Sequence, residues 1–308
     1  HGLDGLFESL QEATRPLDYA HLNSLMDQPT DENISRYLRG RFEYAELVGV
    51  QSTVDQGVDL DSMDQAHIWR RFRFEAAHRL PNVPEGHKCG RMHGHGFEVV
   101  VHVRQSVVGK EMGTDFEAIE SAWAALDAKL NRRCLNQLPG LENPTSEMLA
   151  KWIWERLVLE LESLTCVTVY ETKTAGCHFD GVSFRIWKEQ DFESAVLDAS
   201  GRLLGHSYEL RLHLASELDE VMGWTIDYGD VKARFKETYE ELDHHELHSI
   251  PSIRDSDNPA AVLSWIRSQV CNRLPQLDRI DLFEDRHRGA SLVWGNAQDS
   301  LSLALCPI

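Results

Sequence analysis

The feature that most constrains this chain of 308 residues is an internal repeat with a period of about 115 residues. Three helical patterns end in similar sequences, which begin at Leu17, Leu130 and Leu242. A second helix start follows each pattern, and these starts lie at Pro29, Pro144 and Pro259. Because a supersecondary unit that recurs along a chain folds in a similar way each time, we expect three tandem copies of one unit.

We divide the chain into a partial first copy at 1–67, a complete middle copy at 68–189 and a third copy at 190–308. The first copy starts at its first helix without an opening hairpin, which leaves open whether the copy is degenerate or the hairpin precedes this sequence. In the third copy, the alternating run 205–214 predicts that hairpin. Each copy then ends in a β-rich run, at 47–53, 166–172 and 280–285.

Periodicity predicts two helices in the middle copy. The first has one apolar face, formed at spacings of three and four by Phe116, Ile119, Trp123, Leu126 and Leu130. The second is expected to start near Thr145 or Ser146, because either hydroxyl can cap the first turn and Glu147 favours the positive end of the helix dipole. The third copy repeats the scheme from Tyr228 to Leu242.

Composition narrows the classes of function. With 50 acidic against 31 basic residues, the formal net charge of -19 argues against a general nucleic-acid-binding or anionic-membrane surface. The six cysteines, at positions 89, 134, 166, 177, 271 and 306, form no short-loop disulfide framework, so we expect thiols and a cytoplasmic protein. The sequence has no apolar run of about 18 residues and no signal-peptide pattern, so we expect no membrane span.

A metal site is predicted by three histidines and a cysteine. His93 and His95 are two residues apart, so on a β-strand both side chains leave the same face, and His78 ends an alternating segment that could pair alongside. Three neutral imidazoles hold Zn²⁺ and leave its fourth position open for chemistry. A His-x-His pair alone is more often a coincidence of surface residues, but the addition of His78 and Cys89 favours a metal site.

Five segments follow one another in the order typical of a known family: Phe74-Glu-Ala-Ala-His78-Arg-Leu-Pro81, Glu85-Gly-His-Lys-Cys89-Gly-Arg-Met-His93-Gly-His95, Pro139-Gly-Leu-Glu-Asn-Pro-Thr145-Ser-Glu147, Lys151-Trp-Ile-Trp154 and Glu171-Thr-Lys-Thr-Ala-Gly176. From Phe72 to Trp187 the chain thus resembles the 6-pyruvoyltetrahydropterin synthase family, and most closely its bacterial 6-carboxytetrahydropterin synthases of queuosine biosynthesis. The resemblance implies an α+β chain with the tunnelling fold, in which an antiparallel sheet carries two helices on one side and copies associate into barrels. Three fused copies would form a pseudo-trimeric barrel, and two such rings would stack as a homodimer.

The copies differ at the positions that carry this chemistry. In the third copy the three metal positions hold Val196, Leu204 and His206. We therefore expect this copy to bind no zinc and its lone histidine to be structural. The family's Asp-His pair is Asn131-Arg132 in the middle copy, Asp18-Tyr19 in the first and Asp243-His244 in the third. Because the resemblance implies that this pair comes from an adjacent subunit, we expect one composite site per chain; the alternative interpretation of Asp243-His244 is a charged helix terminus.

The resemblance implies a distinct role for each group of this composite site. The zinc ion on the three histidines would act as a Lewis acid. Cys89 would serve as a thiolate, favoured by Lys88, Arg91 and the zinc ion. His244, oriented by Asp243, would shuttle a second proton.

Two further groups of residues are predicted to bind the substrate. A basic island suited to a triphosphate tail is formed by Arg79, Lys88 and Arg91, with ordinary surface charge as the alternative. The resemblance also implies a glutamate that faces the N–H donors of a pterin ring. Glu171 fits this position together with Thr172 and Thr145, and Glu284 is its equivalent in the third copy.

Three functions remain open. The first, implied by the resemblance, is a zinc-dependent lyase that converts 7,8-dihydroneopterin triphosphate to 6-carboxy-5,6,7,8-tetrahydropterin, acetaldehyde and triphosphate. The second is the sister reaction, in which elimination of triphosphate gives 6-pyruvoyltetrahydropterin. The third is a non-catalytic pterin-binding protein, suggested by the losses in the outer copies. Similarity in the residues that flank the metal site favours the first.

Overall fold

The computed structural model describes residues 3–105, 114–253, 256–285 and 288–295. The helices and strands of the first copy are α1 (Leu3–Thr14), α2 (Asp31–Arg39), β1 (Leu47–Thr53) and β2 (Gln56–Asp61). The next set is β3 (Ala66–His78), β4 (His93–Arg104), α3 (Phe116–Leu130), β5 (Arg133–Cys134), α4 (Ser146–Leu157), β6 (Leu164–Thr172) and β7 (Ala175–Phe179). The last set is β8 (Phe184–Leu197), β9 (Leu203–Ala215), α5 (Tyr228–Leu242), β10 (His245–Glu246), α6 (Pro259–Val270), β11 (Leu277–Asp285) and β12 (Arg288–Val293). Short 3-10 turns are η1 (Arg15–Leu17), η2 (Leu22–Ser24), η3 (Lys88–Gly90), η4 (Leu135–Gln137) and η5 (Leu247–Ser249).

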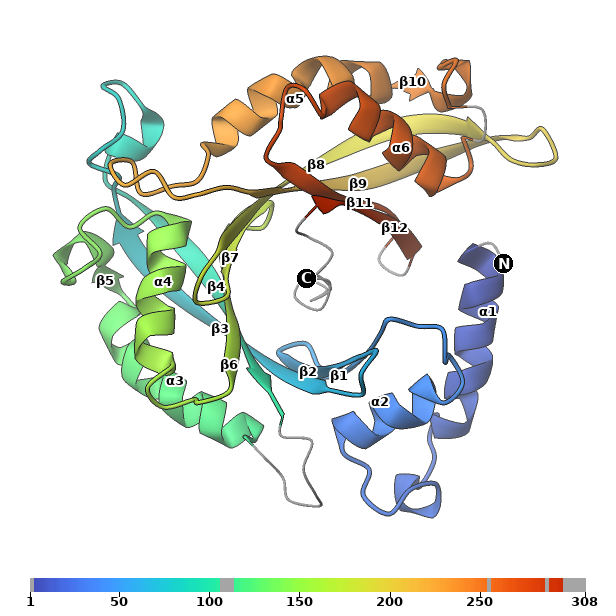
Figure 1. Ribbon diagram of the computed structural model, residues 1–308, viewed down its shortest axis with the longest axis horizontal. Helices are drawn as coiled ribbons and strands as arrows, with labels where there is room; N and C mark the ends of the chain where they lie inside the picture. The colour runs from blue at the N-terminus through green and yellow to red at the C-terminus, as the bar shows by residue number, and fades with distance from the viewer. Residues whose placement is uncertain (1–2, 106–113, 254–255, 286–287, 296–308) are drawn as a thin grey trace.

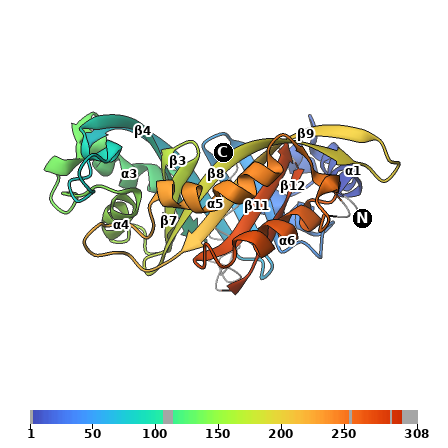
Figure 2. The same cartoon turned by 90° about the horizontal axis from the view of Figure 1, so that it is seen from above.

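The strands form one twelve-stranded sheet with the order β1-β2-β3-β4-β6-β7-β8-β9-β11-β12. Neighbours along this order are antiparallel, whereas the short strands β5 and β10 pair in parallel with β3 and β8 outside it. The sheet curves around a centre, and the helices lie along its outer side (Figure 1). Figure 2, turned by 90°, shows α5 and α6 beside β8 and β11. The predicted α+β class, antiparallel sheet and one-sided helices are confirmed.

Three further expectations concern barrel closure, membrane spans and the state of the cysteines. Strands β1 and β12 end the strand order, so within the described ranges the sheet is open and closure into a barrel is not seen. Among those residues no helix is long and apolar enough to cross a membrane. Every cysteine in the described ranges is a free thiol, and Cys306 lies outside them.

The copies share two unusual backbone features, which support the repeat. The second residue after the first helical segment of each copy has a positive φ, and these residues are Tyr19, Arg132 and His244. The pairing register of each closing hairpin also shifts around one residue, as in a β-bulge, and these residues are Ser52, Glu171 and Glu284. Bulges change the direction of a side chain and often lie next to active sites. The sequence alignment of the three copies therefore corresponds to equivalent backbone positions.

The predicted helices occur where capping and periodicity place them. Asp115 accepts a hydrogen bond from the backbone N–H of Ala118 and begins α3, and Thr145 accepts one from Met148 and begins α4. The apolar face of α3 packs on the outer face of the sheet, where Ile119 and Leu130 are fully buried. Burial of this face provides most of the stability of such a helix.

The opposite, inner face of the sheet carries buried polar groups. Thr168 lies between two histidines, 2.8 Å from His178 Nδ1 and 3.5 Å from His102 Nε2. His213 Nε2 lies 2.8 Å from the Asp281 carboxylate on the next strand. Burial lowers the pKa of His102 to about 3 and that of His213 to about 4, because desolvation disfavours the charged imidazole.

These histidines predict a loss of stability in mild acid. The pKa of His102 is 6.5 in the unfolded chain and about 3 in the folded protein. Between these two pKa values the unfolded chain binds more protons than the folded protein, so lower pH favours unfolding. Between pH 7 and pH 5 this one residue should cost about 2 kcal/mol. His102→Leu should therefore lose less stability over this pH range than the wild type, measured by denaturant unfolding at both pH values. An equal loss in the two proteins would contradict this assignment.

Candidate active site

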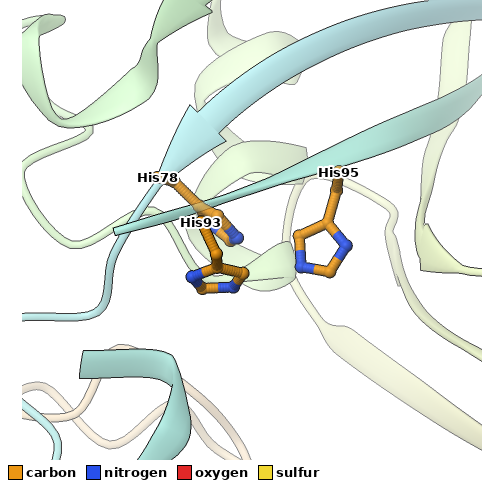
Figure 3. A group of neighbouring side chains, drawn as sticks. All are labelled: His78, His93 and His95. Atoms are coloured by element: carbon orange, nitrogen blue, oxygen red, sulfur yellow. The ribbon is translucent and has the colours of Figure 1, made fainter. Parts of the chain in front are cut away.

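The β3–β4 hairpin brings together the three histidines of the predicted metal site. His78 pairs with His93 across the hairpin, and Ala76 pairs with His95, so the three rings leave the same face. Figure 3 shows them on one side of the two strands. The ring centroids lie 4.6 to 5.1 Å apart, and one ligand nitrogen from each ring lies within 4.8 Å of the others. Phe97 makes edge contacts with His78 and His95 and forms the apolar floor of the site.

Hydrogen bonds orient two of the rings for a metal ion. His78 Nδ1 donates to the Pro144 carbonyl at 3.0 Å, and His93 Nδ1 donates to the Arg91 carbonyl at 2.7 Å, which leaves an Nε2 lone pair on each ring. His78 Nε2 is buried and has no hydrogen-bond partner among the described residues. Burial also lowers the pKa of His78 to about 4. Neutral imidazole is the form that binds metal, so these residues fit a metal ion.

Glu171 lies at the edge of this cluster. Its Oε1 atom is 3.8 Å from Nε2 of both His78 and His95, because the bulge at the end of β6 directs the side chain toward the histidines. Burial, and then the charge of Glu147, raises the pKa of Glu171 to about 7. The carboxyl group can therefore exchange a proton near neutral pH.

Cys89 lies in the 3-10 turn η3, between the two strands that carry the three histidines. Its backbone carbonyl accepts a hydrogen bond from Leu80 at 2.8 Å, and its N–H donates to His87 Nδ1 at 3.2 Å. Burial and then Glu171 raise the pKa of the thiol, whereas Lys88 lowers it less. Lys88 thus favours the thiolate, as expected, but desolvation and the nearby carboxylate outweigh its charge, so the protein's own groups raise the pKa of the thiol overall.

The other predicted substrate residues of the middle copy lie in different surroundings. Thr145 is buried, and its hydroxyl both caps α4 and donates to the Gly223 carbonyl, so its hydrogen-bonding capacity is largely used. Thr172 is exposed and accepts from the backbone of Thr174. The Arg79 side chain is exposed, and so is that of Arg91.

The predicted residues of the third copy lie away from the histidines within one chain. Asp243 contacts His244 at 3.0 Å, so the pair exists, and the His244 side chain is 77% exposed. This pair follows the C-terminal end of α5, whereas the N-terminal end of α5 faces the middle copy. The helix has 15 residues and so a length of about 22 Å. Glu284 interacts with His206 of its own copy.

Several residues that we did not predict also build the site. Glu147 is buried at the start of α4, and its Oε1 accepts from the N–H of Thr225 at 2.9 Å and from its hydroxyl at 3.1 Å. Tyr228 donates to the Gly176 carbonyl at 2.9 Å. The loop before α5 thus covers one side of the middle copy's site. No short motif marks these contacts, because they join residues that lie far apart in the sequence and in different copies.

We expect one equivalent of metal per chain, and we expect that metal to be zinc. A second cluster contains Glu189, but its carboxylate is paired with Arg211 at 2.7 Å and so carries little free charge. His78→Ala should remove the bound metal, and His206→Ala should not. Elemental analysis of protein purified without chelator measures this. Two equivalents per chain, or metal retained in His78→Ala, would contradict the assignment.

Comparison with known proteins gives the same family at both complete copies. The sequence pattern of the 6-pyruvoyl tetrahydropterin synthase family matches residues 67–182 and again 183–293. A 6-carboxy-5,6,7,8-tetrahydropterin synthase of Synechocystis is 40% identical over 119 residues, which span 36% of this chain and 91% of that protein. A dihydroneopterin monophosphate aldolase of Pyrococcus furiosus is 29% identical over 97 residues, spanning 30% and 79%.

A solved structure has the same family name. The 6-pyruvoyl tetrahydropterin synthase of Caenorhabditis elegans aligns with 35% of this chain and 90% of its own, at 24% identity and a TM-score of 0.33. The two matched segments together cover most of the present chain. The chain therefore belongs to the 6-pyruvoyl tetrahydropterin synthase family, of which it contains two copies in tandem.

Proposed function

We propose that this protein is a zinc-dependent 6-carboxy-5,6,7,8-tetrahydropterin synthase. It would convert 7,8-dihydroneopterin triphosphate and water to 6-carboxytetrahydropterin, acetaldehyde and triphosphate, a carbon-carbon lyase reaction within queuosine biosynthesis. The observation that carries the proposal is that one ligand nitrogen from each of three histidines converges in one copy, with Glu171 3.8 Å from two of the rings and in electrostatic contact with Cys89. The name of the Synechocystis relative supports the choice of product.

Each group in this copy has a role that its geometry supports. His78, His93 and His95 would hold the zinc ion, which supplies a Lewis acid that polarises substrate oxygens. Cys89 is held on a fixed turn, where its thiol can exchange a proton with bound substrate. Glu171 lies at the edge of the histidine cluster, where its carboxylate, when ionised, would accept hydrogen bonds from the N–H donors of a pterin ring.

The phosphate end of the substrate would meet basic side chains at the surface. Lys88 precedes the thiol, and its charge acts on both Cys89 and Glu171. Arg79 and Arg91 are exposed at the ends of the same loop. These three basic side chains, on the surface of an otherwise acidic protein, would attract a triphosphate tail.

The two alternative functions have less support. The sister reaction to 6-pyruvoyltetrahydropterin would use the same metal and thiol, so product identity alone separates it. A non-catalytic pterin-binding role fits the third copy, where Val196 pairs with Leu204 and Ser194 with His206, at positions equivalent to those of the metal ligands. The middle copy, however, keeps every ligand together with the thiol.

We also propose that a second chain completes the site. Because Asp243 and His244 lie at the far end of α5 from the middle copy, they would serve the zinc of another chain in a homodimer of two pseudo-trimeric rings. The partner's pair would then supply the proton relay that Asn131 and Arg132 have lost.

The first experiment is an assay of the purified protein with 7,8-dihydroneopterin triphosphate. We expect acetaldehyde and a product with the mass of 6-carboxytetrahydropterin. Cys89→Ala should keep its metal but lose turnover by about 10² or more, the scale for a positioned acid-base group. Release of triphosphate without acetaldehyde would favour the sister reaction. Absence of any turnover, or near-normal turnover in Cys89→Ala, would refute the mechanism.

The composite site predicts complementation between two inactive variants. Cys89→Ala and His244→Ala should each lose activity, because each removes one half of every site. When the two proteins are mixed and re-equilibrated in equal amounts, heterodimers regain one intact site, so activity should return to about a quarter of wild type. Mixing either variant with itself is the control. No recovery in heterodimers confirmed by mass spectrometry would exclude the cross-chain relay.

A further inference from the structure

Two loops from different copies meet beside the thiol. The loop between β3 and β4 carries Cys89, and the loop between β9 and α5 approaches it from the third copy (Figure 1). Asn82 donates to the Val221 carbonyl at 2.6 Å, and His87 Nε2 lies 3.6 Å from Asp227 Oδ2. The ring of Trp224 lies 6.3 Å from that of His87. The third copy therefore touches the very turn that holds the thiol.

Hydrogen bonding determines which nitrogen of His87 carries the proton. Its Nδ1 accepts from the N–H of Cys89 at 3.2 Å, and a nitrogen that accepts has no hydrogen. The hydrogen is therefore on Nε2, which faces the Asp227 carboxylate. One imidazole thus accepts the N–H of Cys89 on one nitrogen and faces the Asp227 carboxylate, 3.6 Å away, with the other.

Asp227 uses its two oxygens for different tasks. Oδ1 caps α5 by accepting from the N–H groups of Gly229 at 2.6 Å and Asp230 at 3.3 Å, and Oδ2 faces His87. The negative charge of this carboxylate also raises the pKa of both Cys89 and Glu171, so it lies close enough to affect the site. Helix capping accounts for the contacts of Oδ1 but not for the position of Oδ2 beside His87.

We propose that His87 and Asp227 form a positioning pair through which the third copy holds the turn that carries the Cys89 thiol. The inference rests on the proposed function for the role of the thiol and extends it to the residues that orient it. The pair lies within one chain and is separate from Asp243 and His244. The thiol-bearing turn of the middle copy is then held in working geometry only when the third copy is docked against it.

The chain contains a matched control for the capping role. Asp115 caps α3 as Asp227 caps α5, by accepting a backbone N–H, and its carboxylate has no close contact with a histidine nitrogen among the described residues. Asn caps helices as well as Asp does. Asp227→Asn and Asp115→Asn therefore keep both caps. Only Asp227→Asn changes a contact to the thiol turn, because its amide N–H₂ would face the Nε2–H of His87.

The turnover experiment compares these two variants. Asp227→Asn should lower kcat by about tenfold with KM changed less than about threefold, since a misplaced thiol affects the chemical step more than binding. Metal content and Tm should match the wild type. Asp115→Asn should leave kcat unchanged. Equal effects of the two variants, or a normal kcat in Asp227→Asn, would overturn the proposal.

A double-variant cycle tests whether the two residues act as one unit. His87→Asn keeps an acceptor for the N–H of Cys89 but removes the imidazole that reaches Asp227. In that background Asp227→Asn should cost little more, because the link is already broken. If the two losses instead multiply, the residues act independently and the positioning pair is wrong.

Two readouts do not depend on turnover. The ¹⁵N spectrum of His87 should show hydrogen on Nε2 in the wild type and a shift toward Nδ1 in Asp227→Asn. Alkylation of Cys89 by iodoacetamide, followed by peptide mass spectrometry, should be at least about threefold faster both in Asp227→Asn and in His87→Asn, which keeps the Asp227 charge, and unchanged in Asp115→Asn. A wild type without pterin turnover would refute the proposed function, and these readouts would still decide the positioning pair. An unchanged tautomer and alkylation rate would refute the pair itself.

Discussion

The register of the β3–β4 hairpin is the constraint on which the site depends. Pairing of His78 with His93 puts three imidazoles on one face, and a shift by one residue would send His93 and His95 to the other face. The register is held by apolar packing further along the same face, where Phe74 stacks on Phe97 at 5.1 Å. The core of the sheet and the candidate metal site are therefore specified by one alternating pattern.

Because the copies are fused into one chain, the sequence of each copy can change independently of the others. The third copy keeps the hairpin geometry, but Val196 and Leu204 occupy two of its metal positions and Val196 is fully buried. The third copy also supplies the loop in which Thr225 donates a hydrogen bond to Glu147. The same loop contacts the middle copy near the thiol. The third copy can do without these histidines because the middle copy retains all three.

Burial explains the electrostatics of the site. Glu171 and Cys89 both have raised pKa values, and His78 has a lowered one, because removal from water disfavours every charged form. The protein thus presents neutral imidazoles, a carboxyl group near its titration point and a thiol that the basic side chains alone do not ionise. This combination suits a site that becomes charged only when a cation and an anionic substrate enter it.

The sequence alone determined the repeat, the helix starts and the histidine triad, because these depend on local rules. Periodicity placed α3 and α5, and the His-x-His spacing put His93 and His95 on one face. Only the tertiary structure decided what lies around the triad. The contact of His87 with Asp227 joins two copies, and the pKa of Cys89 depends on desolvation that no motif records. Spacing along the chain specifies which side chains share a strand face, whereas burial and contacts between copies follow from how the faces pack.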